Sequence, residues 1–273
     1  MCLIALAWRA HPRYRLALIA NRDEFHARPT AAAGVDPDAP EVYGGRDLLQ
    51  GGSWLQVSTR GRLAAVTNVR AGLATETAPR SRGALVRDFV RGAGDAATSL
   101  QALSPVAQAF GRFNLLAWDG DTLAFASNHP GFVTQPVAPG LHAMSNGAFD
   151  APWPKSGHAT GALSYWLQSP ASDVASSIDL AMLAPLFDAL ADTTVAPDPA
   201  LPDTGIGLEL ERMLSSPFVR GERYGTRCSS VVLIDDDAIV FAERRFGPDA
   251  VLLGDSIAVL PMHGGNYGGH TPA

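Results

Sequence analysis

Cys2 has the clearest potential for chemistry in this sequence, because a small second residue generally permits removal of Met1. A processed Cys2 carries a thiol and a free α-amine on the same residue. The α-amine has a pKa of about 7.7–8.0, so it can accept the thiol proton without help from a histidine. The resulting thiolate is a nucleophile, and nearby positive charge lowers its pKa. The alternative interpretation is a small buried hydrophobic residue at a strand edge.

Two short apolar runs, 3–8 and 15–20, flank a turn near His11 and predict a β-hairpin. Partners in an antiparallel pair run in opposite directions, so their residue numbers here add up to about 23. This register places Cys2 opposite roughly Asn21. The polar residues that follow Asn21 are then expected at the end of the second strand, close to Cys2.

Arg22 and Asp23 are the two residues in this polar segment that suit a site around Cys2. The Arg22 guanidinium can lower the thiol pKa and hold a substrate carbonyl or carboxylate. The Asp23 carboxylate can orient the α-amine. A solvated strand end with an ordinary ion pair is the alternative.

Acyl transfer also needs hydrogen-bond donors directed at the developing oxyanion. Three further segments that we expect to end as strands carry suitable polar residues, namely Asn68, Asn146 and Arg227. An asparagine amide offers two N–H donors and does not ionise. Each asparagine alone is weak evidence, because asparagine also favours turns. Together with Cys2 they form a candidate catalytic set.

The expected elements occur as hairpins in groups, with helices between the groups. This order favours antiparallel sheets covered by helices over a parallel doubly wound sheet. The segment 35–52 is rich in Pro, Gly and Asp and is predicted to be a loop. The other predicted strands are 54–58, 62–68, 113–118, 122–127, 141–146, 230–234, 239–243 and 255–260, and the predicted helices are 82–91, 95–110, 160–168, 174–191 and 206–215.

The composition is that of a globular protein, with 47% hydrophobic and 18% charged residues among 273. The net charge is −6 and no cluster of Lys and Arg is present, so we expect no nucleic-acid partner. No run of about 18 apolar residues predicts a membrane span. The apolar start lacks a basic region before it, which argues against a signal peptide, and we expect a cytoplasmic protein. We predict a single domain over 1–261 and a flexible Gly-rich tail over 262–273.

The sequence resembles the NRDE family, also called the Transport and Golgi organisation protein 2 family, almost from end to end. The segments that carry this resemblance are MCLIALAW at 1–8, YRLALIANRDEFHARPT at 14–30, GGRDLLQGGSWLQVSTRGRLAAVTNVR at 44–70, SRGALVRDFV at 81–90, FNLLAWDGDTLAFASN at 113–128, GLHAMSNGAFDAPWPK at 140–155, LPDTGIGLELERMLSSPFV at 201–219 and YGTRCSSVVLID at 224–235.

This family is similar to the N-terminal nucleophile hydrolases, and the resemblance implies an α+β fold. The implied architecture is a four-layer αββα sandwich of two antiparallel sheets flanked by helices. By motif, the catalytic roles carry over to Cys2, Arg22, Asn68, Asn146 and Arg227.

The resemblance also implies an acidic residue after the second strand, and two residues of this sequence are candidates for it. Asp23 directly follows Arg22, whereas in the choloylglycine hydrolase and acid ceramidase group the Asp comes a few residues later. Glu24 is therefore a rival. Cys228 stands where many relatives have Ser, so we expect no second catalytic cysteine.

Two functional hypotheses follow. The first is an amidohydrolase or acyltransferase that acts on C–N amide bonds, other than peptide bonds, of a small molecule, with no metal or cofactor required. The second is a protein that carries a ligand such as haem, a lipid or acyl-CoA without catalysis. Haem needs an axial side chain, and Cys2 and His26 are the candidates.

Overall fold

The computed structural model describes residues 3–73, 76–172 and 178–262 of the 273-residue chain. Cys2 lies outside the described residues. So do the predicted tail from residue 263 onward and the first part of the predicted helix 174–191. In the described part of the chain, no helix combines the length and the apolar character needed to cross a membrane.

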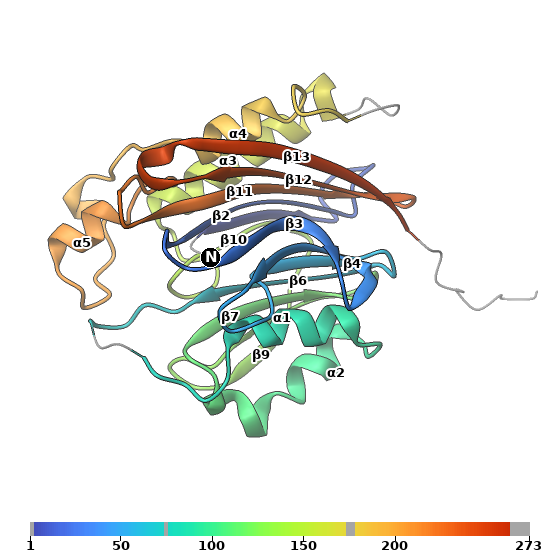
Figure 1. The fold of residues 1–273 in the computed structure, drawn as a ribbon, viewed down its shortest axis with the longest axis horizontal. Coiled ribbons are helices and arrows are strands. Elements are labelled where there is room, and N and C mark those ends of the chain that lie inside the picture. The colour runs from blue at the N-terminus through green and yellow to red at the C-terminus, as the bar shows by residue number, and fades with distance from the viewer. Residues whose placement is uncertain (1–2, 74–75, 173–177, 263–273) are drawn as a thin grey trace, which may run out of the picture.

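Two antiparallel sheets form the centre of the fold (Figure 1). Sheet A has six strands in the order β10-β1-β2-β11-β12-β13, and sheet B has seven in the order β3-β4-β5-β6-β7-β8-β9. The strands are β1 (Leu3–Trp8), β2 (Leu16–Phe25), β3 (Thr30–Asp36), β4 (Ala39–Asp47), β5 (Leu55–Ser58), β6 (Arg62–Asn68), β7 (Phe113–Trp118), β8 (Leu123–Ser127), β9 (Val133–Pro136), β10 (Gly140–Met144), β11 (Tyr224–Ile234), β12 (Ala238–Phe246) and β13 (Leu252–Pro261).

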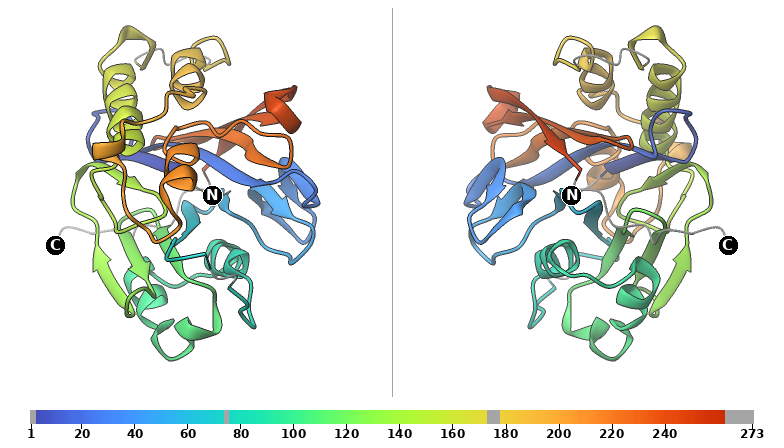
Figure 2. Two further views of the ribbon diagram at one scale, coloured as in Figure 1. Left: turned by 90° about the vertical axis from the view of Figure 1, so that its left-hand side faces the viewer. Right: turned by 90° about the vertical axis from the view of Figure 1, so that its right-hand side faces the viewer.

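Helices cover the outer face of each sheet, which produces the four layers αββα (Figure 2). Sheet A carries α3 (Pro154–Leu167) and α4 (Ala184–Leu190), and sheet B carries α1 (Arg82–Arg91) and α2 (Ala96–Gln101). The helix α5 (Leu208–Met213) lies at one end of the molecule. Short 3₁₀ turns span Ser104–Ala109, Pro170–Ser172, Asp198–Ala200 and Pro248–Ala250. The predicted fold class is confirmed.

Three apolar clusters hold the four layers together. The largest lies between the sheets and joins residues such as Leu18 of β2 to Trp118 of β7. The other two lie between each sheet and its helices. Strand β1 is buried along its whole length because alternate side chains enter two different clusters. This explains why its sequence is continuously apolar instead of alternating.

The predicted loop over 35–52 is wrong, because β3 and β4 form a hairpin there. Bulges interrupt the pairing of these strands, and such positions tolerate glycine. Gly44 has a φ of +151°, and a Cβ at this position would lie 2.5 Å from the carbonyl oxygen of Leu55. The predicted helix over 95–110 is also too long, since α2 ends at Gln101 and a 3₁₀ turn follows. Strand β9 was not predicted.

The hairpin of β1 and β2 is confirmed, but its register is shifted by one residue. Leu3, and not Cys2, lies opposite Asn21. A shift of one residue exchanges the two faces of a strand. In addition, β2 continues to Phe25, so the polar residues from Asn21 onward lie within the strand instead of after it.

Candidate functional site

The start of β1 is the point on which the predicted site residues converge. β1 begins at Leu3 between two partners, with Asn21 of β2 on one side and, one residue later, Met144 of β10 opposite Ile4 on the other. Arg22 follows Asn21, and Asn146 comes two residues after Met144. The sheet therefore brings Arg22 and Asn146 to the two sides of the first described residue.

Arg22 is buried, with 4% of its surface exposed, and its charge is only loosely paired. Its guanidinium lies over the ring of Trp54, 4.2 Å from the ring centroid. One nitrogen is 3.8 Å from a carboxylate oxygen of Glu24, and another donates a long 3.5 Å hydrogen bond to Thr30 Oγ1. This arrangement leaves a buried cation able to take a further partner.

Asp23 and Glu24 emerge on opposite faces of β2, as neighbours in a strand must. Asp23 is buried and accepts a 2.6 Å hydrogen bond from Thr226 Oγ1 on β11. Glu24 lies on the same face as Arg22, with a carboxylate oxygen 3.7 Å from Arg28. The two rivals for the acidic role therefore occupy different environments.

The structure brings Asn68, at the end of β6, together with Asn146. Asn146 Nδ2 donates to the backbone carbonyl of Asn68 at 3.1 Å and to Asn68 Oδ1 at 3.0 Å. Both amide hydrogens of Asn146 are thereby used. Asn68 is half-buried, and no acceptor within the described ranges takes a hydrogen bond from its Nδ2. Of the two predicted oxyanion donors, Asn68 is therefore the one whose amide N–H groups meet no acceptor among the described residues.

Arg70 fixes the orientation of Asn146. Its backbone N–H donates to the Asn146 carbonyl at 2.8 Å, and its side chain donates to Asn146 Oδ1 at 3.2 Å. A second guanidinium nitrogen donates to Glu211 of α5 at 2.8 Å. The buried Glu211 carboxylate also accepts two hydrogen bonds from Thr204, at 2.7 and 2.5 Å. We call these five residues the amide network: Asn68, Arg70, Asn146, Thr204 and Glu211.

Arg70 and Glu211 are absent from the predicted site residues, because no local pattern connects them. The sequence separation between the two side chains is large, and each lies in a segment that reads as an ordinary charged stretch. Both segments do belong to motifs that carry the family resemblance. Those motifs are the available signal for this pair.

Arg227 lies in a β-bulge of β11 between Thr226 and Cys228. Its guanidinium donates to the backbone carbonyls of Phe25 at 2.9 Å and Arg28 at 3.1 Å, which holds the turn after β2. Burial and the nearby charge of Arg22 lower the pKa of Arg227.

Cys228 is buried among the residues between the sheets. Burial and the charge of Glu243 raise the pKa of its thiol, so the thiol stays protonated. A buried, protonated thiol is a poor nucleophile, so the environment of Cys228 agrees with the expectation that it is not a second catalytic cysteine.

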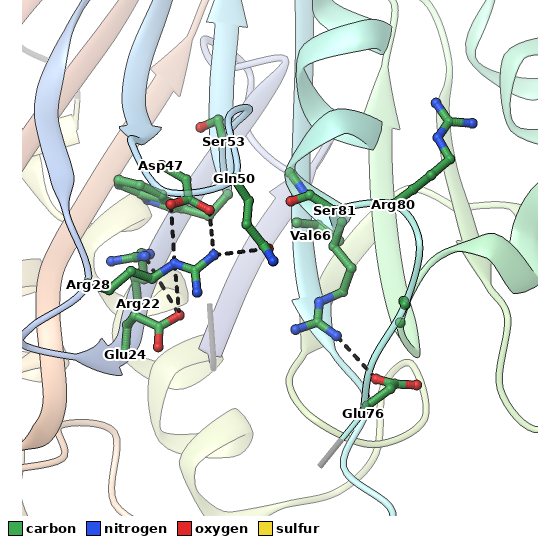
Figure 3. Close-up of a pocket in the computed structure, with 15 residues that line it drawn as sticks. Arg22, Glu24, Arg28, Asp47, Gln50, Ser53, Val66, Glu76, Arg80 and Ser81 are labelled. Carbon is green, nitrogen blue, oxygen red and sulfur yellow. Dashed lines mark hydrogen bonds and ion pairs between the residues drawn. The ribbon is translucent and has the colours of Figure 1, made fainter.

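A pocket of about 140 Å³, here called the central pocket, opens between the end of β2 and the start of α1. One wall carries Arg28, which reaches Asp47, Gln50 and Glu24, and the facing wall carries Glu76 (Figure 3). Val66, two residues before Asn68 on β6, also lines this pocket. The lining is polar, and most of its arginines are paired with acids, so it suits a polar substrate.

Candidate metal and haem ligands are few among the described residues. No group of three or more His, Cys, Asp or Glu side chains in this part of the chain could hold a metal ion. His26 Nδ1 is buried and has no partner in the described ranges, and burial and the charge of Arg227 lower the pKa of His26. Haem ligation by His26 or Cys2 stays a prediction.

Comparison with known proteins places these features in a family. The profile of the family described as Transport and Golgi organisation 2 matches residues 1–248. The Transport and Golgi organization protein 2 homolog of Bos taurus is 35% identical over 265 residues, which cover 89% of this chain and 92% of that protein. The Homo sapiens homolog is 33% identical over 261 residues, with the same coverage of 89% and 92%.

A solved structure shares the fold. The Caenorhabditis elegans ortholog of N-acylethanolamine-hydrolyzing acid amidase aligns with a TM-score of 0.50 at 11% sequence identity. The alignment covers 85% of this chain and 92% of that chain. This likeness supports the N-terminal nucleophile hydrolase fold that the sequence resemblance implies.

Proposed function

Because the chain belongs to the Transport and Golgi organisation 2 family and has the fold of an N-terminal nucleophile hydrolase, we propose that it is an N-terminal-cysteine amidohydrolase or acyltransferase. Its substrate is a small molecule with a C–N amide bond other than a peptide bond. One observation carries the proposal: Arg22 and Asn146 lie on the two sides of the start of β1, and Asn146 holds Asn68.

The position of Leu3 supports Cys2 as the nucleophile. Cys2 is covalently bonded to Leu3, and consecutive Cα atoms are about 3.8 Å apart. The proposal therefore requires the Cys2 sulfur to lie near the Arg22 guanidinium and the Asn68 amide. Cys228, the one cysteine among the described residues, does not compete for this role, because its thiol is buried and protonated.

The reaction follows from these groups. After Met1 is removed, the α-amine of Cys2 accepts the thiol proton, and the thiolate attacks the amide carbonyl carbon. Asn68 Nδ2 stabilises the oxyanion. The C–N bond breaks, the leaving amine takes the proton from the α-ammonium group, and a thioester forms on Cys2. Attack by water releases the acid in a hydrolase, and attack by another amine transfers the acyl group.

The remaining residues position the reacting groups. The charge of Arg22 lowers the pKa of the Cys2 thiol. Asn146 and Arg70 orient Asn68. Asp23 orients the α-amine, with Glu24 as the rival. Arg227 holds the turn after β2 and adds positive charge for a polar substrate group.

The test begins with the intact mass of the purified protein, because the mechanism requires loss of Met1. A panel of small amides is then assayed with the processed protein and with C2S, C2A and C228S. We expect C2A to be inactive and C228S to keep most of the activity. Retained Met1, or full activity of C2A, would rule out this mechanism. Comparison of D23N with E24Q identifies the acid that orients the α-amine.

A further inference from the structure

A second cavity of about 90 Å³ lies beneath β3, against the inner face of sheet A. We call it the arginine chamber, after Arg22, Arg227 and Arg245, which line it together with Trp54, Cys228 and Glu243. Arg22, Cys228 and Arg245 are partners across β2, β11 and β12, so their side chains emerge on the same face. Arg22 and Trp54 also line the central pocket, and form the wall between the two cavities.

The positive charges of the chamber are poorly matched. Arg245 has neither a hydrogen bond nor an ion pair with any described residue. Its neighbour Arg244 provides the contrast, because Arg244 emerges on the other face of β12 and makes two hydrogen bonds to Asp255, at 3.0 and 2.9 Å. The Glu24 carboxylate is 3.8 Å from the Arg22 guanidinium. Arg227 donates its hydrogen bonds to neutral backbone carbonyls and not to an acid.

Two buried N–H donors at the chamber lack acceptors in the described ranges. They are Trp54 Nε1, on a side chain only 5% exposed, and Arg245 Nε. Buried donors are almost always paired in native proteins, and unpaired ones call for an explanation such as a missing ion. Both of these side chains line the same small cavity.

Glu243 is the single acid among the described residues that line the chamber. Its Oε1 already accepts a 2.8 Å hydrogen bond from the backbone of Ala33. Burial raises the pKa of Glu243, and this one carboxyl group faces three arginines in the lining. The chamber is therefore cationic, although the whole chain has a net charge of −6.

We propose that the arginine chamber binds a small oxyanion, a carboxylate or a phosphate group, which accepts hydrogen bonds from Arg245, Arg22 and Trp54. Arginine guanidinium groups match such oxygens in a fork geometry. A water molecule occupies about 30 Å³ of liquid, so the chamber has room for a group of a few heavy atoms. The proposal goes beyond the proposed function and holds whether or not Cys2 is catalytic.

The test is a titration of the full-length protein with sodium phosphate and, separately, with sodium acetate at constant ionic strength. Thermal unfolding and isothermal calorimetry report binding, because a ligand that binds the folded state raises the Tm in a saturable way. The phosphate and acetate titrations distinguish the tetrahedral from the planar anion. We expect saturable binding of at least one anion to the wild type.

Variants locate the anion. R245Q should weaken binding by roughly tenfold or more, which corresponds to the loss of about one charge-assisted hydrogen bond. R244Q, the matched control on the opposite face of β12, should bind as the wild type does. W54F keeps an aromatic ring over Arg22 but removes the indole N–H, and should weaken binding by a smaller factor.

Two results would overturn the proposal. One is the absence of saturable binding of either anion to the wild type. The other is equal affinity in R245Q and the wild type. Circular dichroism checks the folding of R245Q, and should this variant be unfolded, W54F decides the question: unchanged affinity in W54F then counts against the chamber.

Discussion

The amide network and the arginine chamber lie near the same strand ends, yet they differ in how far their polar groups are hydrogen-bonded. In the amide network, Arg70 is shared between Glu211 and Asn146, and Glu211 accepts three hydrogen bonds. In the chamber, buried donors on Trp54 and Arg245 have no described acceptor. The paired charges of Arg70 and Glu211 stabilise the fold, whereas the unpaired donors of the chamber keep their capacity for a ligand. Substitutions in the two regions should therefore affect different properties.

The largest effect is expected for E211A in the amide network. Removal of this carboxylate leaves Arg70, whose side chain is only 10% exposed, as a cation without its ion pair. This costs about 3–5 kcal/mol of unfolding free energy. Urea unfolding measures the loss. E209A, at an exposed position on the same helix, serves as the control and should change stability by less than about 0.5 kcal/mol. A small loss in E211A would mean that the amide network is not structural.

N146A should lower the unfolding free energy by less, about 1–3 kcal/mol. It leaves the hydrogen-bonding groups of Asn68 and Arg70 without their partner, but the ion pair between Arg70 and Glu211 stays intact. A double-mutant cycle with R70A isolates the coupling between the two side chains. We expect a coupling energy of about 0.5–3 kcal/mol. Strict additivity of the two substitutions would contradict the contact between Arg70 and Asn146.

The chamber should respond to E243Q through the pH dependence of stability. Burial raises the pKa of Glu243 in the folded state above its unfolded value of about 4.3. The folded protein thus binds this proton more tightly, and stability is lost as the pH rises from about 4.3 through the folded pKa. E243Q removes that loss. Urea unfolding across pH 4 to 8 should show E243Q as more stable than the wild type at neutral pH, with the two curves converging in acid.

R245Q should have the smallest effect on stability in the absence of an anion. No described residue loses a hydrogen bond or an ion pair in this variant, so the change should stay within about 0.5 kcal/mol. Urea unfolding in a buffer without phosphate or carboxylate measures it. A loss above about 1 kcal/mol would show that Arg245 is part of the structural framework, which would bring the two regions closer together.

Local sequence patterns were sufficient for the hairpins that fill the centre of the fold. The apolar runs 113–118 and 122–127, for example, flank a turn and predict the hairpin that is observed. The β3–β4 hairpin could not be predicted in this way, because its segment is rich in the Pro, Gly and Asp residues that usually mark loops. The register of β1 and β2 depends on the length of the turn between them, which the sequence does not specify to one residue.

In the candidate site, too, some residues follow from a local sequence pattern and others only from contacts between distant segments. Asn68 and Asn146 were predictable because each stands near the end of an apolar strand. The link between Arg70 and Glu211 depends on a contact between segments far apart in the chain, so no local pattern encodes it. Arg245 reads as half of a surface pair with Arg244. Strand alternation puts the two side chains on opposite faces, but the position of β12 within sheet A decides which of them faces the chamber.

The order of strands in sheet A also determines when each strand can find its partner during synthesis. β2 is made early, but its neighbour β11 comes late, as the pairing of Ile19 with Val231 shows. At about 5–20 residues per second, a ribosome needs roughly 10–40 seconds to make the chain between them. Throughout that interval one edge of β2 has no strand to pair with, and the apolar hairpin at the start of the chain is exposed to association with other chains. The pairing that completes the middle of sheet A therefore cannot form until the last quarter of the chain has been made.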